Sequence, residues 1–271
     1  MPRSRTMGNA QEDGLRGTSR TGEQPVEIFH IYSTDQLRER AEVVVGHVKE
    51  NGCALIRGLF SRDAIRKCAD SVYAHANRAA HLASGGVSRE SVRRNISKWS
   101  IGGMSASQAG VSRFMLMVYN PMACADIFRL HRTFRTLIEA RDILAMRDEV
   151  LFDEKLPPPL FNGTRIQIYP KGGGFMTAHR DSRAAENLKG FSDTYVQLVL
   201  LLTEKGVDYT AGGAYIRRGE DAIDAEAGSL ASDVLVYDGN TLHGVEDIDP
   251  DLPFTPSDLC GRAVALATIY N

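Results

Sequence analysis

The sequence predicts an α+β protein in which N-terminal helices pack against a strand-rich C-terminal half, itself a β-sandwich or barrel. Two observations lead to this prediction. Capped, amphipathic segments typical of helices occupy the first half of the chain. From Arg165 onward, short apolar runs alternate with Gly, Asp and Pro, which is the pattern of several short strands joined by turns.

The chain is expected to form one domain after a disordered tail. Residues 1–25 contain almost no apolar side chains, so they cannot bury enough surface to offset the entropy of ordering. We expect a single domain over residues 26–271. Within it, residues 26–160 form a helix-rich support that includes a candidate lid, and residues 161–271 form the strand-rich half.

Net charge and hydropathy exclude two classes of partner. The 32 basic and 34 acidic residues give a formal charge of −2, which provides no electrostatic basis for binding nucleic acid or an anionic membrane. The longest apolar run, at 195–202, is the size of a strand and far from the ~20 residues of a membrane span. A small-molecule partner is therefore favoured, and the oligomeric state is left open.

Cysteine usage indicates a reducing compartment. The four cysteines are widely spaced and include no C-x-x-C pair, which argues against a zinc ribbon and against a disulfide framework. We expect four reduced thiols, mostly buried. Because the N-terminus also lacks the apolar stretch of a secretory signal, the sequence predicts a cytoplasmic protein.

The first helix is expected to follow Ser33, which fits a capping box with Gln36, and to stop at Gly52. Its apolar stripe comprises Leu37, Ala41, Val44 and Val48. A short strand at 53–60 and a second helix, capped by Ser61, follow it. A stretch rich in helix-forming residues occupies 122–150.

The segment 84–110 is polar and rich in Gly and Ser, and a loop of this length is usually functional or mobile. On one interpretation, this segment forms a lid over the substrate. The candidate substrate contacts on it are Arg93, Arg94, Asn95 and Trp99. An ordinary exposed loop is an equally good interpretation of the same residues.

The stretch "GGGFMTAHRDS" (172–182) contains the first two candidate functional residues. On an extended segment His179 and Asp181 point to the same side, so an imidazole and a carboxylate can meet. His243 follows a later predicted strand, at a separation that a jelly roll can close. Two imidazoles and one carboxylate on one face of a metal match the facial triad of non-haem iron oxygenases. Alternatively, Asp181 forms a surface ion pair with Arg180 or Arg183.

The motifs "YPKGGGFMTAHRD", "GGAYI" and "VYDGNTLHGV", followed by the arginine-led strand "GRAVALATIYN", resemble the catalytic half of the prolyl-hydroxylase-like Fe(II)/2-oxoglutarate oxygenases. The resemblance covers about residues 160–271. It implies a double-stranded β-helix core (a jelly roll, cupin-like) with Fe(II), and with 2-oxoglutarate and O₂ as cosubstrates. It also implies that His179, Asp181 and His243 ligate the iron, while Arg262 and Tyr169 contact 2-oxoglutarate.

Three positions depart from the pattern of the family. An apolar run around Leu201 stands where prolyl hydroxylases often have a second tyrosine, Val264 stands where many relatives have serine, and an insert separates His243 from Arg262. The glycine run is also similar to bacterial oxygenases of free amino acids, including halogenases. Because those halogenases replace the carboxylate ligand with a small residue, the presence of Asp181 disfavours halogenation.

The resemblance implies a dioxygenase that oxidises an unactivated C–H bond of a small polar metabolite, an amino acid or its derivative, with hydroxylation as the default outcome. Desaturation, oxidative cyclisation and peptidyl hydroxylation remain open with the same ligands. Two other classes are also consistent with the residues: a non-catalytic jelly-roll binding protein, and a zinc hydrolase with a metal-bound water.

Overall fold

The computed structural model describes residues 26–79, 81, 92–103, 111–181 and 195–270. The tail expected at residues 1–25 lies outside these ranges. Three α-helices and twelve strands make up the described chain. The helices are α1 (Thr34–Asn51), α2 (Arg62–Ala76) and α3 (His131–Leu144). A short 3₁₀ turn, Asp153–Lys155, precedes the strand-rich half.

The sequence signals at the first two helices act as predicted. Ser33 Oγ accepts a hydrogen bond from the backbone N–H of Gln36, and Ser61 Oγ accepts one from the N–H of Ala64. The stripe predicted on α1 is buried in full. Gly52 ends α1 with φ 93°, a conformation that glycine adopts without steric cost.

The strands join in one continuous sheet. Before the strand-rich half come β1 (Ile28–His30), β2 (Cys53–Arg57), β3 (Ser97–Gly103) and β4 (Val111–Tyr119). The half itself contains β5 (Phe161–Pro170), β6 (Gly174–His179), β7 (Val196–Leu201), β8 (Gly213–Arg218), β9 (Asp221–Asp224), β10 (Val234–Asp238), β11 (His243–Ile248) and β12 (Gly261–Tyr270). The order is β1-β2-β10-β7-β12-β5-β4-β6-β11-β8-β9, with β3 paired to β4.

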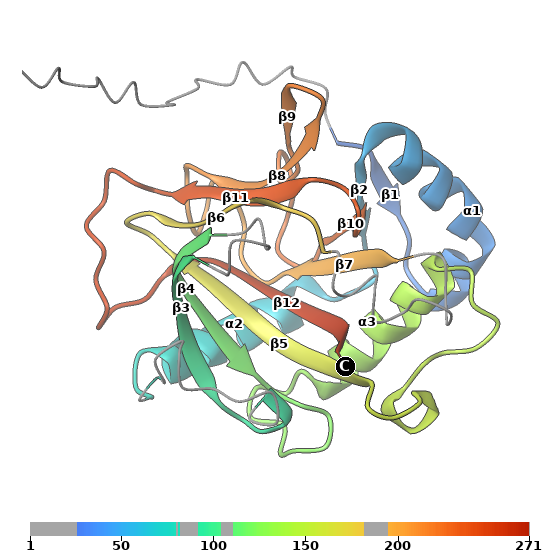
Figure 1. Ribbon diagram of the computed structural model, residues 1–271, viewed down its shortest axis with the longest axis horizontal. Helices are drawn as coiled ribbons and strands as arrows, with labels where there is room; N and C mark the ends of the chain where they lie inside the picture. The colour runs from blue at the N-terminus through green and yellow to red at the C-terminus, as the bar shows by residue number, and fades with distance from the viewer. Residues whose placement is uncertain (1–25, 80, 82–91, 104–110, 182–194, 271) are drawn as a thin grey trace, which may run out of the picture.

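This sheet folds over on itself into two facing layers (Figure 1). One layer contains β10, β7, β12 and β5, and the other contains β6, β11, β8 and β9. Side chains meet between the layers: the Tyr237 and His243 rings lie 4.5 Å apart, and the Tyr169 hydroxyl lies 3.7 Å from Met176 Sδ. In the first layer every pair of adjacent strands is far apart in sequence, which is the topology of a jelly roll.

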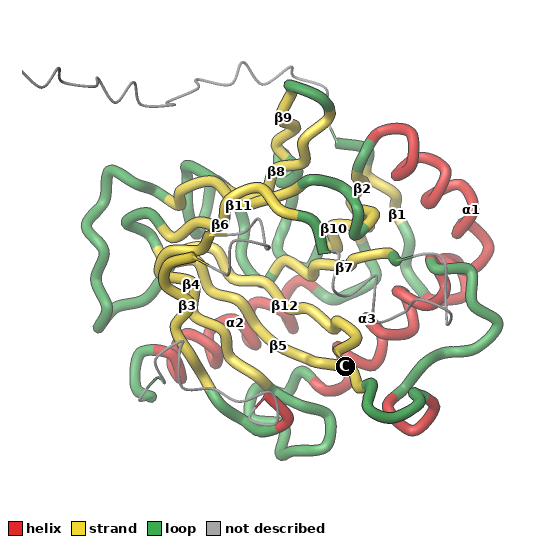
Figure 2. The backbone as a smooth tube through the Cα atoms, in the orientation of Figure 1, coloured by secondary structure: helices red, strands yellow, loops and turns green. Residues whose placement is uncertain are grey.

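The helices cover the outer face of the first layer (Figure 2). Alternate residues of its strands, among them Ile166, Leu198 and Ala265, share a buried cluster with Val44 of α1 and Leu137 of α3. The intervening residues point between the two layers. Because the helices take up the outer apolar face, the inner face remains available for polar side chains.

The segment before β4 differs from the sequence prediction. The segment 84–110, expected as a loop, includes β3, which pairs with β4 in antiparallel register from Ser97↔Val118 to Gly103↔Val111. Residues 84–91 and 104–110 of that segment lie outside the described residues. The helix-rich half therefore also contributes strands to the sheet, since β4 bridges β5 and β6.

Of the four free thiols only Cys53 is fully buried, so the expectation of mostly buried cysteines was wrong.

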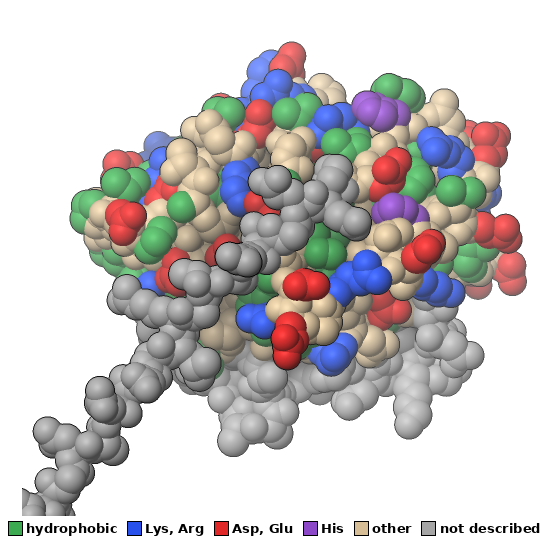
Figure 3. All heavy atoms as spheres, turned by 90° about the horizontal axis from the view of Figure 1, so that it is seen from above, with side chains coloured by type: hydrophobic (Ala, Val, Ile, Leu, Met, Phe, Trp, Pro, Cys, Tyr) green, Lys and Arg blue, Asp and Glu red, His purple; other side chains and the backbone are tan. Residues whose placement is uncertain are grey.

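None of the described helices is long and apolar enough to cross a membrane. Basic and acidic side chains are interspersed on the described part of the face shown in Figure 3, as the small net charge predicts.

Candidate metal centre

The three predicted ligand residues lie together between the two layers. His179 ends β6, His243 begins β11, and the two histidines are direct partners in the antiparallel register of these strands. Asp181 lies two residues after His179, and its backbone N–H donates to the carbonyl of Gly239 at 2.9 Å. One ligand atom from each of the three residues lies within 4.8 Å of the others.

The glycine run fixes the start of β6. Gly172 and Gly173 have φ values of 86° and 92°, in the region that side chains rarely adopt. A Cβ on Gly172 would lie 2.4 Å from the backbone nitrogen of Phe254. The N–H of Gly173 donates to the carbonyl of Ile248 on β11 at 2.9 Å. The run thus allows a tight turn that keeps β6 in register with β11.

Backbone carbonyls determine the tautomers of both histidines. Nδ1 of His179 lies 3.0 Å from the carbonyl of Thr177, and Nδ1 of His243 lies 2.8 Å from that of Thr241. A carbonyl only accepts, so each Nδ1 carries a proton and, in a neutral ring, each Nε2 presents a lone pair. Metal-binding histidines are typically oriented in this way by their second nitrogen.

Both Nε2 atoms face the Asp181 carboxylate. The distance from Oδ1 to Nε2 of His179 is 3.8 Å, and from Oδ2 to Nε2 of His243 it is 3.6 Å. Burial lowers the pKa of His243, although the charge of Asp181 partly opposes this. A neutral imidazole is the form that binds metal. Two lone pairs and a carboxylate facing one point fit a divalent cation, and the donors suit Fe(II) or Zn(II).

Aromatic and amide side chains line the interior beside this cluster. The Tyr237 ring packs against His243, and the Tyr195 hydroxyl donates to Oε1 of Gln197. Burial raises the pKa of both tyrosines well above the usual value, so both remain neutral donors. The interior therefore combines apolar rings with a few fixed polar groups, as small-molecule sites do.

Arg262 lies inside the barrel, next to the other predicted cosubstrate residue. Its strand position pairs with Tyr169, and its guanidinium carbon lies 5.2 Å from the centroid of the Tyr169 ring. The structure adds a partner that the sequence did not indicate. Glu226, with 0% exposure, accepts from Nε and Nη2 of Arg262, and it also accepts from the Tyr209 hydroxyl.

The four predicted substrate residues have varied contacts. Arg93 is exposed, donates to the carbonyl of Pro159 and stacks 4.2 Å from the centroid of the Phe161 ring. Asn95 donates to the carbonyl of Ala125. Trp99 packs on His81 and Phe254, at 5.7 and 6.1 Å between ring centroids. Arg94 is exposed. Among the described residues, no hydrogen bond or ring contact joins these four side chains to the metal cluster.

Sequence reasoning missed Glu226, Tyr209 and Arg165. Glu226 follows β9 in a turn, and nothing in its neighbourhood of the sequence shows that it reaches Arg262. For Arg165 a signal existed. In "RIQIYP" the residues Arg165, Gln167 and Tyr169 alternate with isoleucines, which places three polar side chains on one face of a buried strand.

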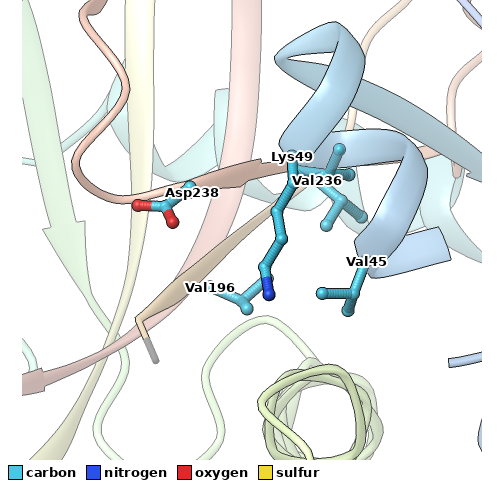
Figure 4. A pocket seen from close by; sticks show the side chains of 6 residues that line it. Val45, Lys49, Val196, Val236 and Asp238 are labelled. Carbon is cyan, nitrogen blue, oxygen red and sulfur yellow. The ribbon is translucent and has the colours of Figure 1, made fainter. Parts of the chain in front are cut away.

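A small hollow lies apart from these residues, between α1 and the ends of β7 and β10 (Figure 4). Its volume of about 10 Å³ is that of roughly one water molecule, too small for a metabolite. Its lining residues are Val45, Val48, Lys49, Val196, Val236 and Asp238.

The layered topology defines the chain as a double-stranded β-helix, which confirms the predicted fold. No protein-family model and no curated protein matches the sequence. Solved structures with the same fold include two with TM-scores above 0.5. One is the non-heme alpha ketoglutarate dependent epimerase SnoN from nogalamycin biosynthesis, with TM-score 0.53 and 12% identity over 86% of this chain and 83% of that one. The other is a Pseudomonas putida prolyl-4-hydroxylase, with TM-score 0.51 and 13% identity over 85% and 99%.

Proposed function

We propose that the protein is a non-haem Fe(II)/2-oxoglutarate-dependent dioxygenase that oxidises an unactivated C–H bond of a small polar metabolite, an amino acid or its derivative. The arrangement of the metal cluster is the observation that carries this proposal. Two Nε2 lone pairs, each oriented by an Nδ1–carbonyl hydrogen bond, face one carboxylate inside a double-stranded β-helix. Three protein ligands on one face leave room for a cosubstrate and O₂.

In this proposal His179, Asp181 and His243 hold the iron, and Tyr169 and Arg262 contact 2-oxoglutarate. Bound iron and 2-oxoglutarate supply the oxidising power that O₂ alone lacks at a C–H bond. The task of the chain is to orient the substrate and exclude water. Glu226 positions Arg262 by engaging Nε and Nη2. The side-chain hydrogen bonds of Arg262 to described residues come from Nε and Nη2, and the proposal assigns Nη1 to the ligand.

The reaction outcome is proposed as hydroxylation, and the two solved structures illustrate why the fold does not decide it. One is described as an epimerase and the other as a prolyl-4-hydroxylase. Desaturation or oxidative cyclisation would need the same ligands and a different placement of the substrate. A small substrate is favoured over a peptide because the polar groups that surround the cluster, such as Gln197, are buried inside the barrel.

The experiment is an anaerobic titration of the metal-free protein with Fe(II) and then 2-oxoglutarate. A chelated keto acid gives a weak visible charge-transfer band, which we expect for the wild type. His243→Ala should lose the band. The matched control is His30→Ala, because His30 is an exposed histidine on β1.

Each other outcome identifies a rival. Tight Fe(II) binding without the band would reject the cosubstrate and favour a zinc hydrolase, which uses the same donors with a metal-bound water. Absence of metal binding in the wild type would favour a non-catalytic binding protein. Loss of the band in His30→Ala would show that the signal does not report on the cluster.

A further inference from the structure

Three arginines are buried among the described residues, and two of them have a carboxylate partner. Arg141 donates from Nε to Asp142 at 2.9 Å, and Arg262 donates from Nη2 to Glu226 at 2.5 Å. Arg165 is 8% exposed, yet no carboxylate of the described chain lies within 4 Å of its guanidinium nitrogens. A buried charge without a partner is costly, so a protein that retains one usually has a use for it.

The guanidinium of Arg165 is held in place but only partly satisfied. Nη1 donates to Thr268 Oγ1 at 2.9 Å and, more weakly, to the carbonyl of Gly163 at 3.4 Å. Its carbon lies 5.2 Å from the centroid of the Tyr270 ring. Nε is buried and has no hydrogen-bond partner. An arginine fixed by a hydroxyl and a ring, with an unused donor, is prepared to bind an anion.

Arg165 faces the interior that contains the metal cluster. It shares an inward face of β5 with Gln167 and Tyr169, whereas Ile166 and Ile168 join the core beneath the helices. Burial alone would lower the pKa of Arg165, but nearby phenols and the charge of Asp181 raise it. The Asp181 charge thus acts on Arg165 across the interior between the two layers.

A second cation lies on the same side. Lys98 Nζ is 5.9 Å from the centroid of the Tyr119 ring, and burial together with repulsion from Arg165 lowers the pKa of Lys98. Arg165 and Lys98 repel each other, and neither forms a salt bridge with a described carboxylate. This part of the interior therefore favours a negatively charged ligand.

We infer that Arg165 binds the carboxylate of the substrate, and that the substrate is a free α-amino acid or its N-acyl derivative. The inference rests on the proposed function, because it takes the metal cluster as the reacting centre. Arg262 is already paired with the Glu226 carboxylate, whereas Arg165 has no carboxylate partner in the described chain and its Nε has no acceptor. Arg165 thus distinguishes the substrate from neutral metabolites of similar size.

The test measures binding rather than turnover. Wild type, Arg165→Met and the control Arg38→Met, an exposed position on α1, are loaded with Fe(II) and 2-oxoglutarate under anaerobic conditions. The twenty standard L-amino acids and their N-acetyl derivatives are screened by thermal shift. Compounds that stabilise the wild type are titrated calorimetrically, beside their carboxamides.

We expect Arg165→Met to weaken binding of the acid on the order of 100-fold, as removal of one partner from a buried charge pair does. The carboxamide should bind the wild type as weakly as the acid binds the variant. The affinity for 2-oxoglutarate should be the same in both proteins. In the absence of ligands, Arg165→Met should not be less stable than the wild type, because no described carboxylate loses its partner.

Three results would overturn the inference while leaving the proposed function intact. The first is an unchanged affinity of Arg165→Met for the acids, and the second is a wild type that binds none of the panel. The third is a loss of affinity of Arg165→Met for 2-oxoglutarate but not for 2-oxovalerate, which lacks the distal carboxylate. The last result would assign Arg165 to the cosubstrate. A wild type without the charge-transfer band would instead reject the proposed function, and calorimetry would still report amino-acid binding.

Discussion

Glu226 accepts hydrogen bonds from both Nε and Nη2 of Arg262, at 2.8 and 2.5 Å, in a pair that solvent does not reach. The Tyr209 hydroxyl donates to the same carboxylate. The pair joins β12 to the turn after β9. Arg262, which the family resemblance assigns to 2-oxoglutarate binding, therefore also takes part in a buried ion pair.

Breaking this pair should destabilise the protein strongly. Arg262→Met leaves the Glu226 carboxylate buried without its cation, and we expect a loss of about 3–5 kcal/mol in the free energy of unfolding. The double variant Arg262→Met/Glu226→Met should lose less than either single variant, since no buried charge remains. Urea unfolding of the four proteins measures this coupling. A cost below 1 kcal/mol for Arg262→Met would show that the pair is not formed.

The proposed contact between Arg262 and 2-oxoglutarate can be separated from this structural role. Arg262→Lys keeps the charge beside Glu226 but loses the planar fork. We expect a weaker charge-transfer titration with 2-oxoglutarate, by roughly 10-fold to 100-fold. Titration with 2-oxovalerate should be unchanged, because that keto acid has no distal carboxylate. Equal losses for both keto acids would instead indicate a general disturbance of the site.

A fall in pH should weaken the ion pair between Glu226 and Arg262. Burial opposes ionisation of Glu226, but the charge and hydrogen bonds of Arg262 hold the pKa of this carboxyl below its usual value. A carboxyl with a depressed pKa stabilises the fold fully above its unfolded pKa of about 4.3, and this contribution disappears as the pH falls through the folded pKa.

Glu226→Gln cannot titrate, so its deficit relative to the wild type should be largest near pH 7 and should shrink below about pH 4. Urea unfolding between pH 3 and 7 gives the difference directly, because the remaining acidic groups contribute equally to both proteins. A deficit that does not change with pH would mean that Glu226 keeps its proton in the folded protein.

Much of the scaffold could be predicted from the sequence because its signals are local. Ser33, the α1 stripe and Gly52 each act within one helix. The cluster of His179, Asp181 and His243 was predictable because His179 and Asp181 lie two residues apart at the end of one strand, and His243 follows a recognisable turn. The hairpin of β3 and β4 was missed because the polar, glycine-rich residues of β3 pair through their backbones. Glu226 was missed because its contact with Arg262 depends on tertiary folding.

Thiol reactivity should differ sharply along the chain. Burial raises the pKa of Cys53 to about 12, whereas the side chain of Cys260 is exposed. The thiolate is the reactive form, so Cys53 should resist alkylation in the folded protein at pH 8 and react only after unfolding. Peptide mapping after iodoacetamide treatment measures this. Alkylation of Cys53 at the rate of Cys260 would contradict the burial of Cys53 on β2.

Metal binding should stabilise the wild type through the three ligand side chains alone. At a free Fe(II) concentration of 100 times Kd, linkage predicts a gain of about 2.7 kcal/mol. Asp181→Ala should lose this gain and all substrate oxidation. Its metal-free form should unfold within about 0.5 kcal/mol of the wild type, because among the described residues the Asp181 carboxylate lies near no basic side chain except the two imidazoles.

Anaerobic thermal unfolding with and without Fe(II) tests this, with His30→Ala as the control that should retain the full gain. If Asp181→Ala kept the Fe(II)-dependent stabilisation, the metal would bind elsewhere and the convergence of His179, Asp181 and His243 would have another cause. If the free energy of unfolding of the metal-free variant instead fell by several kcal/mol, Asp181 would be a structural residue. A side chain that serves only as a metal ligand contributes little to stability when the metal is absent.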